Sequence, residues 1–195
     1  MLVRLLHRVA AHPRVYEWIQ RTAGYAEIAG RVARCLPAAP SATVLDVGAG
    51  TGALRRVVHG RCRYIWLDID PVKLRGFLAK GGHPLTMLAD ASRLPVGDRG
   101  VDYVVCVDLS HHLQDDRLAG LMGELARVVR KQVIFVDGVK RQDSVLSRFL
   151  WRLDRGSHPR TEDTLLAALG GALRVDRVER FTVYHTYLLC VASPL

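Results

Sequence analysis

The sequence predicts a single α/β domain built around a mostly parallel β-sheet whose last strand is antiparallel. From Thr43 onward, short apolar runs alternate with helix-length amphipathic stretches, which is the pattern of repeated βαβ units. The apolar runs are continuous rather than alternating, as expected for parallel strands that helices cover on both faces. Near the end of the chain, two β-rich segments meet at a short polar joint near Tyr184, which predicts a hairpin and an antiparallel final strand.

Five predicted strands precede this hairpin. Four are the apolar runs TVLDVG (43–48), YIWLD (64–68), VDYVVCV (101–107) and QVIFVD (132–137), and a further strand is expected at 83–88. Apolar residues at helical spacing predict helices at about 52–59, 71–80, 114–130 and 141–153. Further helices are expected in the first 36 residues, which end at a break over Pro37–Pro40.

Length and composition limit what kind of protein this is. A chain of 195 residues suffices for one buried core and is short for two domains. No apolar run approaches the roughly 18 residues of a membrane span, and charged residues interrupt the apolar N-terminal stretch. We therefore expect no membrane span and a cytoplasmic location. The four cysteines are scattered without a CxxC pair, so neither a disulfide framework nor a metal site is predicted.

The positive charge of the chain raises the question of nucleic-acid binding. The formal net charge is +9, from 28 Lys and Arg against 19 Asp and Glu. A nucleic-acid footprint requires that basic residues cluster, whereas here they are spread along the chain with no basic run and no interleaved aromatic residues. A solvated, arginine-rich surface is therefore the favoured interpretation.

The segment VLDVGAGTGAL, residues 44–54, carries the strongest functional signal. A strand runs directly into Gly48, Gly50 and Gly52, and a helical pattern follows. Glycines at such a turn allow strained backbone angles and let a ligand lie against the amides at the start of a helix. Ala53 stands where a dinucleotide-binding G-x-G-x-x-G pattern has its last glycine, so a nicotinamide enzyme is a weaker alternative.

Acidic residues follow the next strand ends. Asp68 ends the second predicted strand, where a carboxylate can accept both hydrogen bonds of a ribose diol. Asp70 precedes Pro71 and fits the N-cap of the next helix better. Asp90, in LADASRLP, is placed to accept from an exocyclic adenine amine. Asp46 lies inside the first strand and needs a partner, for which a ligand's ammonium group or nearby backbone amides are candidates.

In order and spacing, VLDVGAGTG, LDIDPVKL, LADASRLP and VDYVVCVDLSHHL resemble the class I S-adenosylmethionine-dependent methyltransferases over about residues 40–140. The resemblance implies a Rossmann-like three-layer sandwich with a seven-stranded sheet. It also implies a single methyltransferase domain over 1–195, with a helical N-terminal cap (1–40), a cofactor-binding core (41–140) and a substrate-side loop with the C-terminal strands (141–195).

The same resemblance assigns roles to individual residues. The glycine loop faces the methionine part of S-adenosylmethionine, Asp68 holds the ribose hydroxyls, and Ile69 packs on the adenine. Asp90 and the amide of Ala91 meet the adenine edge, and Asp108 lines the methyl-donor region. The cofactor-binding set is Asp46, Gly48, Ala49, Gly50, Gly52, Asp68, Ile69, Asp90, Ala91 and Asp108.

Two departures from the family pattern are informative. DLSHHL replaces the (N/D)PP(Y/F) motif, which argues against methylation of planar exocyclic nitrogens in nucleic acid. VVRKQ replaces the glycine-bearing turn before the fifth strand, which should shorten that loop without touching the cofactor.

The methyl acceptor should bind beyond the carboxyl ends of the strands. His111 and His112 follow the fourth strand and are candidate catalytic bases, with packing of the next helix as the alternative. The loop 152–161 contains Arg152, Arg155, His158 and Arg160, which could bind an anionic acceptor or form a solvated turn before a helix capped at Thr161. The N-terminal aromatic residues could close over the site or pack; of these, Tyr16 is the candidate substrate contact.

Three function classes follow. The favoured one is O-, N- or C-methylation of a small molecule, with no nucleic acid partner and with the oligomeric state left open. The others are an RNA or protein methyltransferase and a non-catalytic S-adenosylmethionine-binding module.

Overall fold

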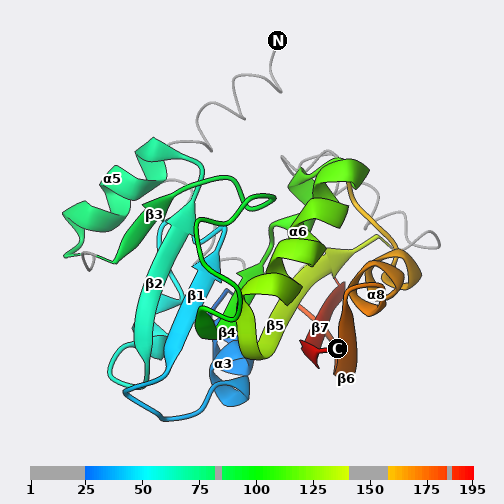
Figure 1. Ribbon diagram of the computed structural model, residues 1–195, viewed down its shortest axis with the longest axis horizontal. Coiled ribbons are helices and arrows are strands. Elements are labelled where there is room, and N and C mark those ends of the chain that lie inside the picture. The colour runs from blue at the N-terminus through cyan, green and yellow to red at the C-terminus, as the bar shows by residue number, and fades with distance from the viewer. Residues whose placement is uncertain (1–24, 82–84, 141–157, 184–185) are drawn as a thin grey trace.

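A β-sheet that is seven-stranded in the described part of the chain forms the centre of the protein (Figure 1). The computed structural model describes residues 25–81, 85–140, 158–183 and 186–195. The strands are β1 (Thr43–Val47), β2 (Arg63–Asp68), β3 (Thr86–Leu88), β4 (Val101–Val107), β5 (Val129–Val139), β6 (Leu173–Thr182) and β7 (Thr186–Pro194). They lie side by side in the order β3-β2-β1-β4-β5-β7-β6.

The strand directions confirm the predicted sheet. β1 to β5 pair in parallel, whereas β7 lies antiparallel between β5 and β6. β6 forms one edge of the sheet, and its sequence LRVDRVERFT places charged side chains along that edge. Charges on an edge strand oppose pairing with a second sheet, which explains why this strand reads as less apolar than its neighbours.

Helices cover both faces of the sheet, which gives the three layers that the sequence predicts. The helices are α3 (Tyr25–Cys35), α4 (Arg55–Val58), α5 (Pro71–Ala79), α6 (Asp115–Val128) and α8 (Glu162–Gly170). α6 and α8 pack on the face toward the viewer in Figure 1, whereas α3 packs on the opposite face. Among the described residues, no helix has both the length and the apolar composition needed to span a membrane.

Several element boundaries differ from the prediction. The helix expected at 52–59 is reduced to α4, because 51–54 form turns that continue the glycine segment. The strand expected at 132–137 is longer, since β5 begins at Val129 and pairs there with Val101. α6 ends at Val128, so helix and strand meet with no loop between them, which goes beyond the predicted shortening.

Some expectations lie wholly or partly outside the described residues. The helix expected at 141–153 lies outside them entirely. Of the expected N-terminal helices, the structure describes only α3, which ends before the predicted break at Pro37–Pro40. The strand expected at 83–88 is seen as β3 over its last three residues.

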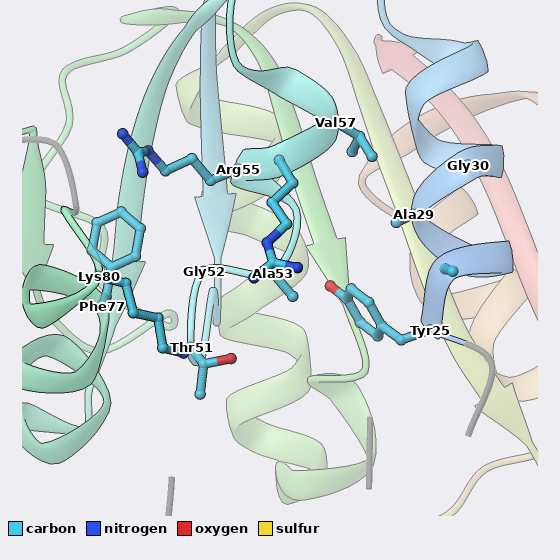
Figure 2. Close-up of a pocket in the computed structure, with 12 residues that line it drawn as sticks. Tyr25, Ala29, Gly30, Thr51, Gly52, Ala53, Arg55, Val57, Phe77 and Lys80 are labelled. Carbon is cyan, nitrogen blue, oxygen red and sulfur yellow. The ribbon is translucent and has the colours of Figure 1, made fainter. Parts of the chain in front are cut away.

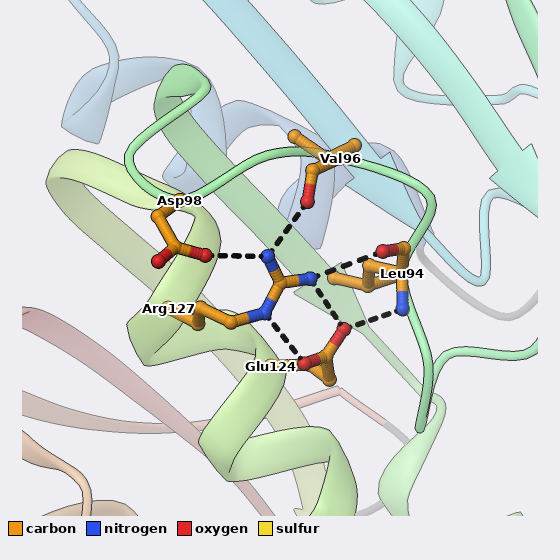
Figure 3. A network of polar contacts seen from close by, with 5 residues as sticks. All are labelled: Leu94, Val96, Asp98, Glu124 and Arg127. Atoms are coloured by element: carbon orange, nitrogen blue, oxygen red, sulfur yellow. Dashed lines mark hydrogen bonds and ion pairs between the residues drawn. The ribbon is translucent and has the colours of Figure 1, made fainter.

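The segment after β3 is fixed to α6 by one arginine (Figure 3). The guanidinium of Arg127 donates to the carbonyl oxygens of Leu94 and Val96, and to the carboxylates of Asp98 and Glu124, over distances of 2.8–3.1 Å. Glu124 also accepts a hydrogen bond from the Leu94 amide. A planar group with five donors satisfies this set of acceptors in a way that a lysine ammonium cannot.

Arg127→Lys is therefore expected to lower the melting temperature by roughly 3–8 °C, because several of these bonds are lost from a partly buried group. Thermal unfolding measured by circular dichroism checks this. The control is Arg174→Lys, since Arg174 bonds only to Asp176 among the contacts seen and its side chain is 68% exposed. A shift as small as that of the control would show that the Arg127 network contributes little.

Candidate active site

The candidate site lies where the order of the strands reverses. β1 sits between β2 and β4, so the chain leaves β1 toward one edge of the sheet and later continues from β4 toward the other. Such a switch point leaves a crevice beyond the carboxyl ends of the two strands, where open α/β sheets bind ligands. A Cβ built on Gly48 would lie 3.0 Å from the side chain of Leu109, so the turn after β1 touches the segment after β4.

The turn after β1 requires glycine at the three predicted positions. Gly48, Gly50 and Gly52 have φ angles of +73°, +56° and +74°, which other L-residues rarely adopt. Among the atoms of the described residues, a Cβ on Gly50 would meet only the Gly48 carbonyl oxygen, at 3.9 Å. A ligand can therefore approach the backbone closely at Gly50.

The amides of this turn donate to the protein, which differs from the expectation that a ligand would bind them. The Ala49 N–H donates to the Leu67 carbonyl oxygen at 2.9 Å, and the Gly50 N–H donates to the Asp68 carboxylate at 2.8 Å. The Trp66 indole N–H donates to the Gly50 carbonyl oxygen at 3.0 Å. These bonds hold the turn against β2. A ligand can still approach the backbone closely, because glycine has no Cβ atom.

Asp68 ends β2 and is buried beneath this turn. One carboxylate oxygen accepts from Gly50, the other accepts from the Asp70 amide at 2.9 Å, and Lys73 lies 3.7 Å away. A carboxylate offers about four lone-pair positions, so Asp68 keeps acceptor capacity for a diol. Asp70 instead caps α5, with its side chain accepting from the Val72 amide, as the sequence predicts.

Two large apolar side chains are exposed beside Asp68. Ile69 follows it directly and is 63% exposed, and Leu88 is 53% exposed on the neighbouring strand, paired in register with Asp68. Exposed aliphatic groups next to a carboxylate suit a nucleoside, whose base packs on apolar surface while its ribose offers hydroxyl donors. The open backbone at Gly50, the acceptors of Asp68 and this apolar surface together fit the adenosyl part of S-adenosylmethionine.

Asp46 finds its partner in a side chain that sequence analysis missed. It is buried inside β1, and its carboxylate accepts a hydrogen bond from the Tyr64 hydroxyl at 2.5 Å. Burial raises the pKa of Asp46 to about 7; the Tyr64 bond opposes the shift and the charge of Asp68 adds to it. Tyr64 pairs with Val44 on the adjacent strand, and Val44 shares a face of the sheet with Asp46, two residues later. The alternation of side chains along paired strands could therefore have indicated this contact.

The raised pKa of Asp46 predicts a dependence of stability on pH. Between pH 4 and 7 the folded protein keeps a proton that the unfolded chain releases. The free energy of unfolding therefore falls as pH rises through this window, by up to about 1.4 kcal/mol per pH unit from Asp46 alone. Asp46→Asn removes this titration, so urea unfolding should show the variant gaining about 2 kcal/mol relative to the natural protein between pH 5 and 7. A difference that stays constant with pH would contradict the buried, protonated carboxyl.

Asp90 is tied into its own turn. One oxygen accepts from both the amide and the hydroxyl of Ser92, at 2.9 and 2.8 Å, and the other pairs with Arg117. The bonds from Ser92 lower the pKa of Asp90, so it is ionised at neutral pH. Ala91 beside it is buried against the α6 side of the sheet.

The segment after β4 brings a histidine against a buried carboxylate. Asp108 directly follows β4 with a φ of +51°, and a short 3₁₀ helix, η1 (Ser110–His112), comes next. His111 is buried and its Nδ1 lies 2.6 Å from Asp137 at the end of β5, whereas His112 is exposed. The rings of the two histidines are 4.2 Å apart. Asp137 was missed by the sequence reading, although it ends an apolar run as Asp68 does.

The predicted acceptor loop reaches this histidine in part. The amide of His158 donates to the carbonyl oxygen of His111 at 3.0 Å. Arg160 is buried and donates to the carbonyl oxygens of Ser110 and Leu113, so it braces the protein instead of offering a guanidinium to an acceptor. Thr161 caps α8 as predicted. Three other predicted contacts lie outside the described residues: Tyr16, Arg152 and Arg155.

A cavity of about 350 Å³ lies between the glycine turn and α3 (Figure 2). Its wall is largely apolar, with Tyr25 and Phe77, and three cations also line it: Arg55, Arg56 and Lys80. Of the predicted cofactor residues, only Gly52 lines this cavity. The ring of Phe77 occupies the space that a side chain at position 52 would need. The cavity is thus a neighbour of the predicted cofactor site and is largely distinct from it.

Comparison with known proteins supports the resemblance in sequence. A model of the methyltransferase domain family matches residues 45–136, which run from β1 through the glycine turn to β5. No curated protein matches the chain in sequence.

Solved structures share the fold at low sequence identity. A candidate methyltransferase from Bacillus halodurans C-125 is 17% identical with a TM-score of 0.72, over 86% of this chain and 99% of that one. A chain from the complex of the Haloferax volcanii Trm112 methyltransferase activator with a candidate methyltransferase is 18% identical with a TM-score of 0.76, over 97% and 98%. Geranyl diphosphate C-methyltransferase from Streptomyces coelicolor A3(2), in complex with Mg²⁺, geranyl-S-thiolodiphosphate and S-adenosyl-L-homocysteine, is 13% identical with a TM-score of 0.68, over 85% and 76%.

Family match, strand order and the geometry of the glycine turn agree. Residues 45–136 match the methyltransferase domain family, and the strand order and the glycine turn agree with the class I, S-adenosylmethionine-dependent enzymes.

Proposed function

We propose that this enzyme transfers the methyl group of S-adenosylmethionine to a small-molecule acceptor. The observation that carries the proposal is the convergence, at one switch point of the sheet, of an open glycine turn with Asp68 on one side and a buried histidine on the other. The glycine turn and Asp68 suit an adenosyl ligand, and the histidine suits proton transfer from an acceptor.

The proposed cofactor contacts extend from the glycine turn along the ends of β2 and β3. Asp46, Gly48, Ala49, Gly50 and Gly52 would face the methionine part. Asp68 would accept from the ribose hydroxyls beside the exposed side chain of Ile69, which would pack on the adenine. The adenine edge would meet Asp90 and the amide of Ala91, and Asp108 would line the methyl-donor region.

Bound S-adenosylmethionine supplies a methyl group that its sulfonium already activates. The chain's own task is to place the acceptor atom in line with that group and to exclude water. His111 and His112 would contact the acceptor from η1. His158, whose backbone amide bonds to His111, would also contact the acceptor. Tyr16, Arg152 and Arg155 are the other proposed substrate contacts.

The spread of basic residues along the sequence favours a small acceptor over RNA, because a nucleic-acid footprint requires that they cluster. Many arginines in the described part of the chain are also paired with nearby carboxylates. These include Arg31, Arg117, Arg127, Arg130, Arg160, Arg174, Arg177 and Arg180. The four free cysteines suit a reducing compartment, and we place the enzyme in the cytoplasm on that ground.

A ligand comparison followed by an acceptor screen tests the proposal. S-Adenosylmethionine and S-adenosylhomocysteine should each raise the melting temperature, whereas NAD should not. Transfer of radiolabelled methyl is then measured with pools of small hydroxyl, amine and allylic diphosphate compounds, and with total RNA at several salt concentrations. Transfer to RNA that falls steeply with salt, or cofactor binding without transfer to any acceptor, would replace the proposal by one of its two alternatives.

A further inference from the structure

Asp137 is a buried carboxylate that accepts hydrogen bonds from η1 and from the next residue of its own strand. One oxygen lies 2.6 Å from His111 Nδ1 and 2.8 Å from the Gly138 amide, and the other accepts from the Ser110 hydroxyl and amide at 2.6 and 2.7 Å. Burial alone would raise the pKa of Asp137, but the charge of His111 and the bonds from His111 and Ser110 outweigh it, so the pKa is lowered. Asp137 is therefore an ionised acceptor that the fold has fixed in place.

This contact determines which nitrogen of His111 carries the proton when the ring is neutral. An ionised carboxylate accepts hydrogen bonds only, so Nδ1 must be protonated. Nε2 then holds the lone pair and is the basic atom. The ring is also fixed in orientation, because the backbone of η1 is held by the bonds from Arg160 to the carbonyl oxygens of Ser110 and Leu113.

The His111–Asp137 pair lies next to the glycine turn of the proposed cofactor site. η1 follows β4 at the switch point, and Leu109, two residues before His111, contacts Gly48 of the glycine turn. Among the described residues, the charged and titratable groups around the imidazole include Asp137 from β5, His112 from η1 itself and Asp108, which follows β4. Potential ligand atoms of Asp108, His111 and Asp137 lie within 4.8 Å of one another.

Two other uses of this cluster fit the contacts less well. A metal ion held by Asp108, His111 and Asp137 would have to take over Nδ1 or the Asp137 oxygens, which are already engaged in hydrogen bonds. A nucleophilic serine would need to donate to the histidine, whereas the Ser110 hydroxyl donates to Asp137. The contacts match a histidine base oriented by an aspartate.

The geometry points to His111 as the general base of methyl transfer and to Asp137 as the residue that positions it. This inference rests on the proposed function and narrows it: the acceptor carries a proton on the atom that is methylated, as a hydroxyl or amine does. Nε2 takes that proton, the acceptor's electron pair forms the new bond to the methyl carbon, and the carbon–sulfur bond breaks with its electrons left on sulfur. The proton on the imidazolium then passes to solvent.

The tautomer of His111 can be measured without any acceptor. Nitrogen-15 NMR of imidazole-labelled protein should show His111 protonated at Nδ1 and bare at Nε2 when neutral, and Asp137→Asn should shift the population toward Nε2–H. Asp102→Asn is the matched control, because it removes a hydrogen-bonded carboxylate from the opposite end of β4. It should cost stability without changing the tautomer. A natural protein with Nε2–H would overturn the inference.

The second part of the test measures catalysis, with the acceptor found in the screen. His111→Gln should lower kcat by about 10²–10⁴-fold and abolish the acidic limb of the pH–rate profile, with the Kd for S-adenosylmethionine within twofold. Asp137→Asn should lower kcat by at least about 100-fold with a similarly unchanged Kd. A His111→Gln enzyme that keeps its rate and its acidic limb would disprove the base while leaving methyl transfer itself intact. Displacement of the His111 signals by Zn²⁺ or Mg²⁺, or loss of activity in EDTA, would overturn the inference in favour of a metal site.

Discussion

Replacing Asp68 with alanine is expected to weaken the binding of S-adenosylmethionine by about 100-fold. A carboxylate that accepts two ribose hydroxyls contributes about 1.5–3 kcal/mol per charged hydrogen bond, so its loss should weaken cofactor binding strongly. The variant also removes the acceptor for the Gly50 amide, so the glycine turn loses part of its attachment to β2. Isothermal titration calorimetry, carried out well below the melting temperature of the variant, gives the Kd directly.

Asp70→Ala provides the matched control for that measurement. Asp70 lies two residues away and caps α5, so its loss should cost about 1 kcal/mol of stability while leaving the Kd within twofold. Equal affinities for the Asp68 variant and the natural protein would remove the ribose role from Asp68. Equal losses in the two variants would instead mean that a general loosening of the β2–α5 junction causes the effect.

Gly52→Ala is expected to destabilise the fold by about 3 kcal/mol or more. The φ of +74° costs a side chain roughly 1–2 kcal/mol, and the new Cβ would lie 2.2 Å from the ring of Phe77. That ring cannot withdraw easily, because it is buried and stacked on Trp66 with centroids 5.7 Å apart. Urea unfolding at neutral pH should show the loss as a lower midpoint.

The control for the glycine prediction is Gly123→Ala in the middle of α6. In the part of the chain that the structure describes, no atom beyond its own helix and chain neighbours lies within 4 Å of a Cβ placed there, so alanine should stabilise the helix by about 0.5–1 kcal/mol. Opposite signs at the two glycines would separate the steric demand of the turn from the general effect of adding a methyl group. A Gly52→Ala protein as stable as the natural one would show that Phe77 can move aside.

The architecture was predictable because each of its signals is local. Continuous apolar runs gave the parallel strands, and the two β-rich segments around Tyr184 gave the antiparallel pair β6 and β7. The boundaries were less predictable where tertiary pairing decides them. Val129 and Arg130 continue the helical pattern of α6 in sequence, yet pairing with β4 draws them into β5.

In the candidate site, too, some residues could be predicted from the sequence and others could not. Asp68 and Asp90 could be singled out because strand ends and turns are visible in the sequence. The partners of buried groups could not, since Tyr64 reaches Asp46 from a neighbouring strand and Asp137 reaches His111 across 26 residues. The bracing role of Arg160 was equally hidden, because a loop arginine looks the same in sequence whether it points outward or inward.

The junction where α6 passes straight into β5 has a consequence for how this enzyme can diverge. Alternate residues of a strand face opposite sides of the sheet, so inserting a single residue reverses every side chain that follows. With no intervening loop, an insertion at Val128–Val129 that is not absorbed by the register shift between Val129 and Gln132 would turn Asp137 to the opposite layer, away from its imidazole. Related sequences that retain the histidine–aspartate pair should therefore keep the number of residues between the end of this helix and the aspartate unchanged.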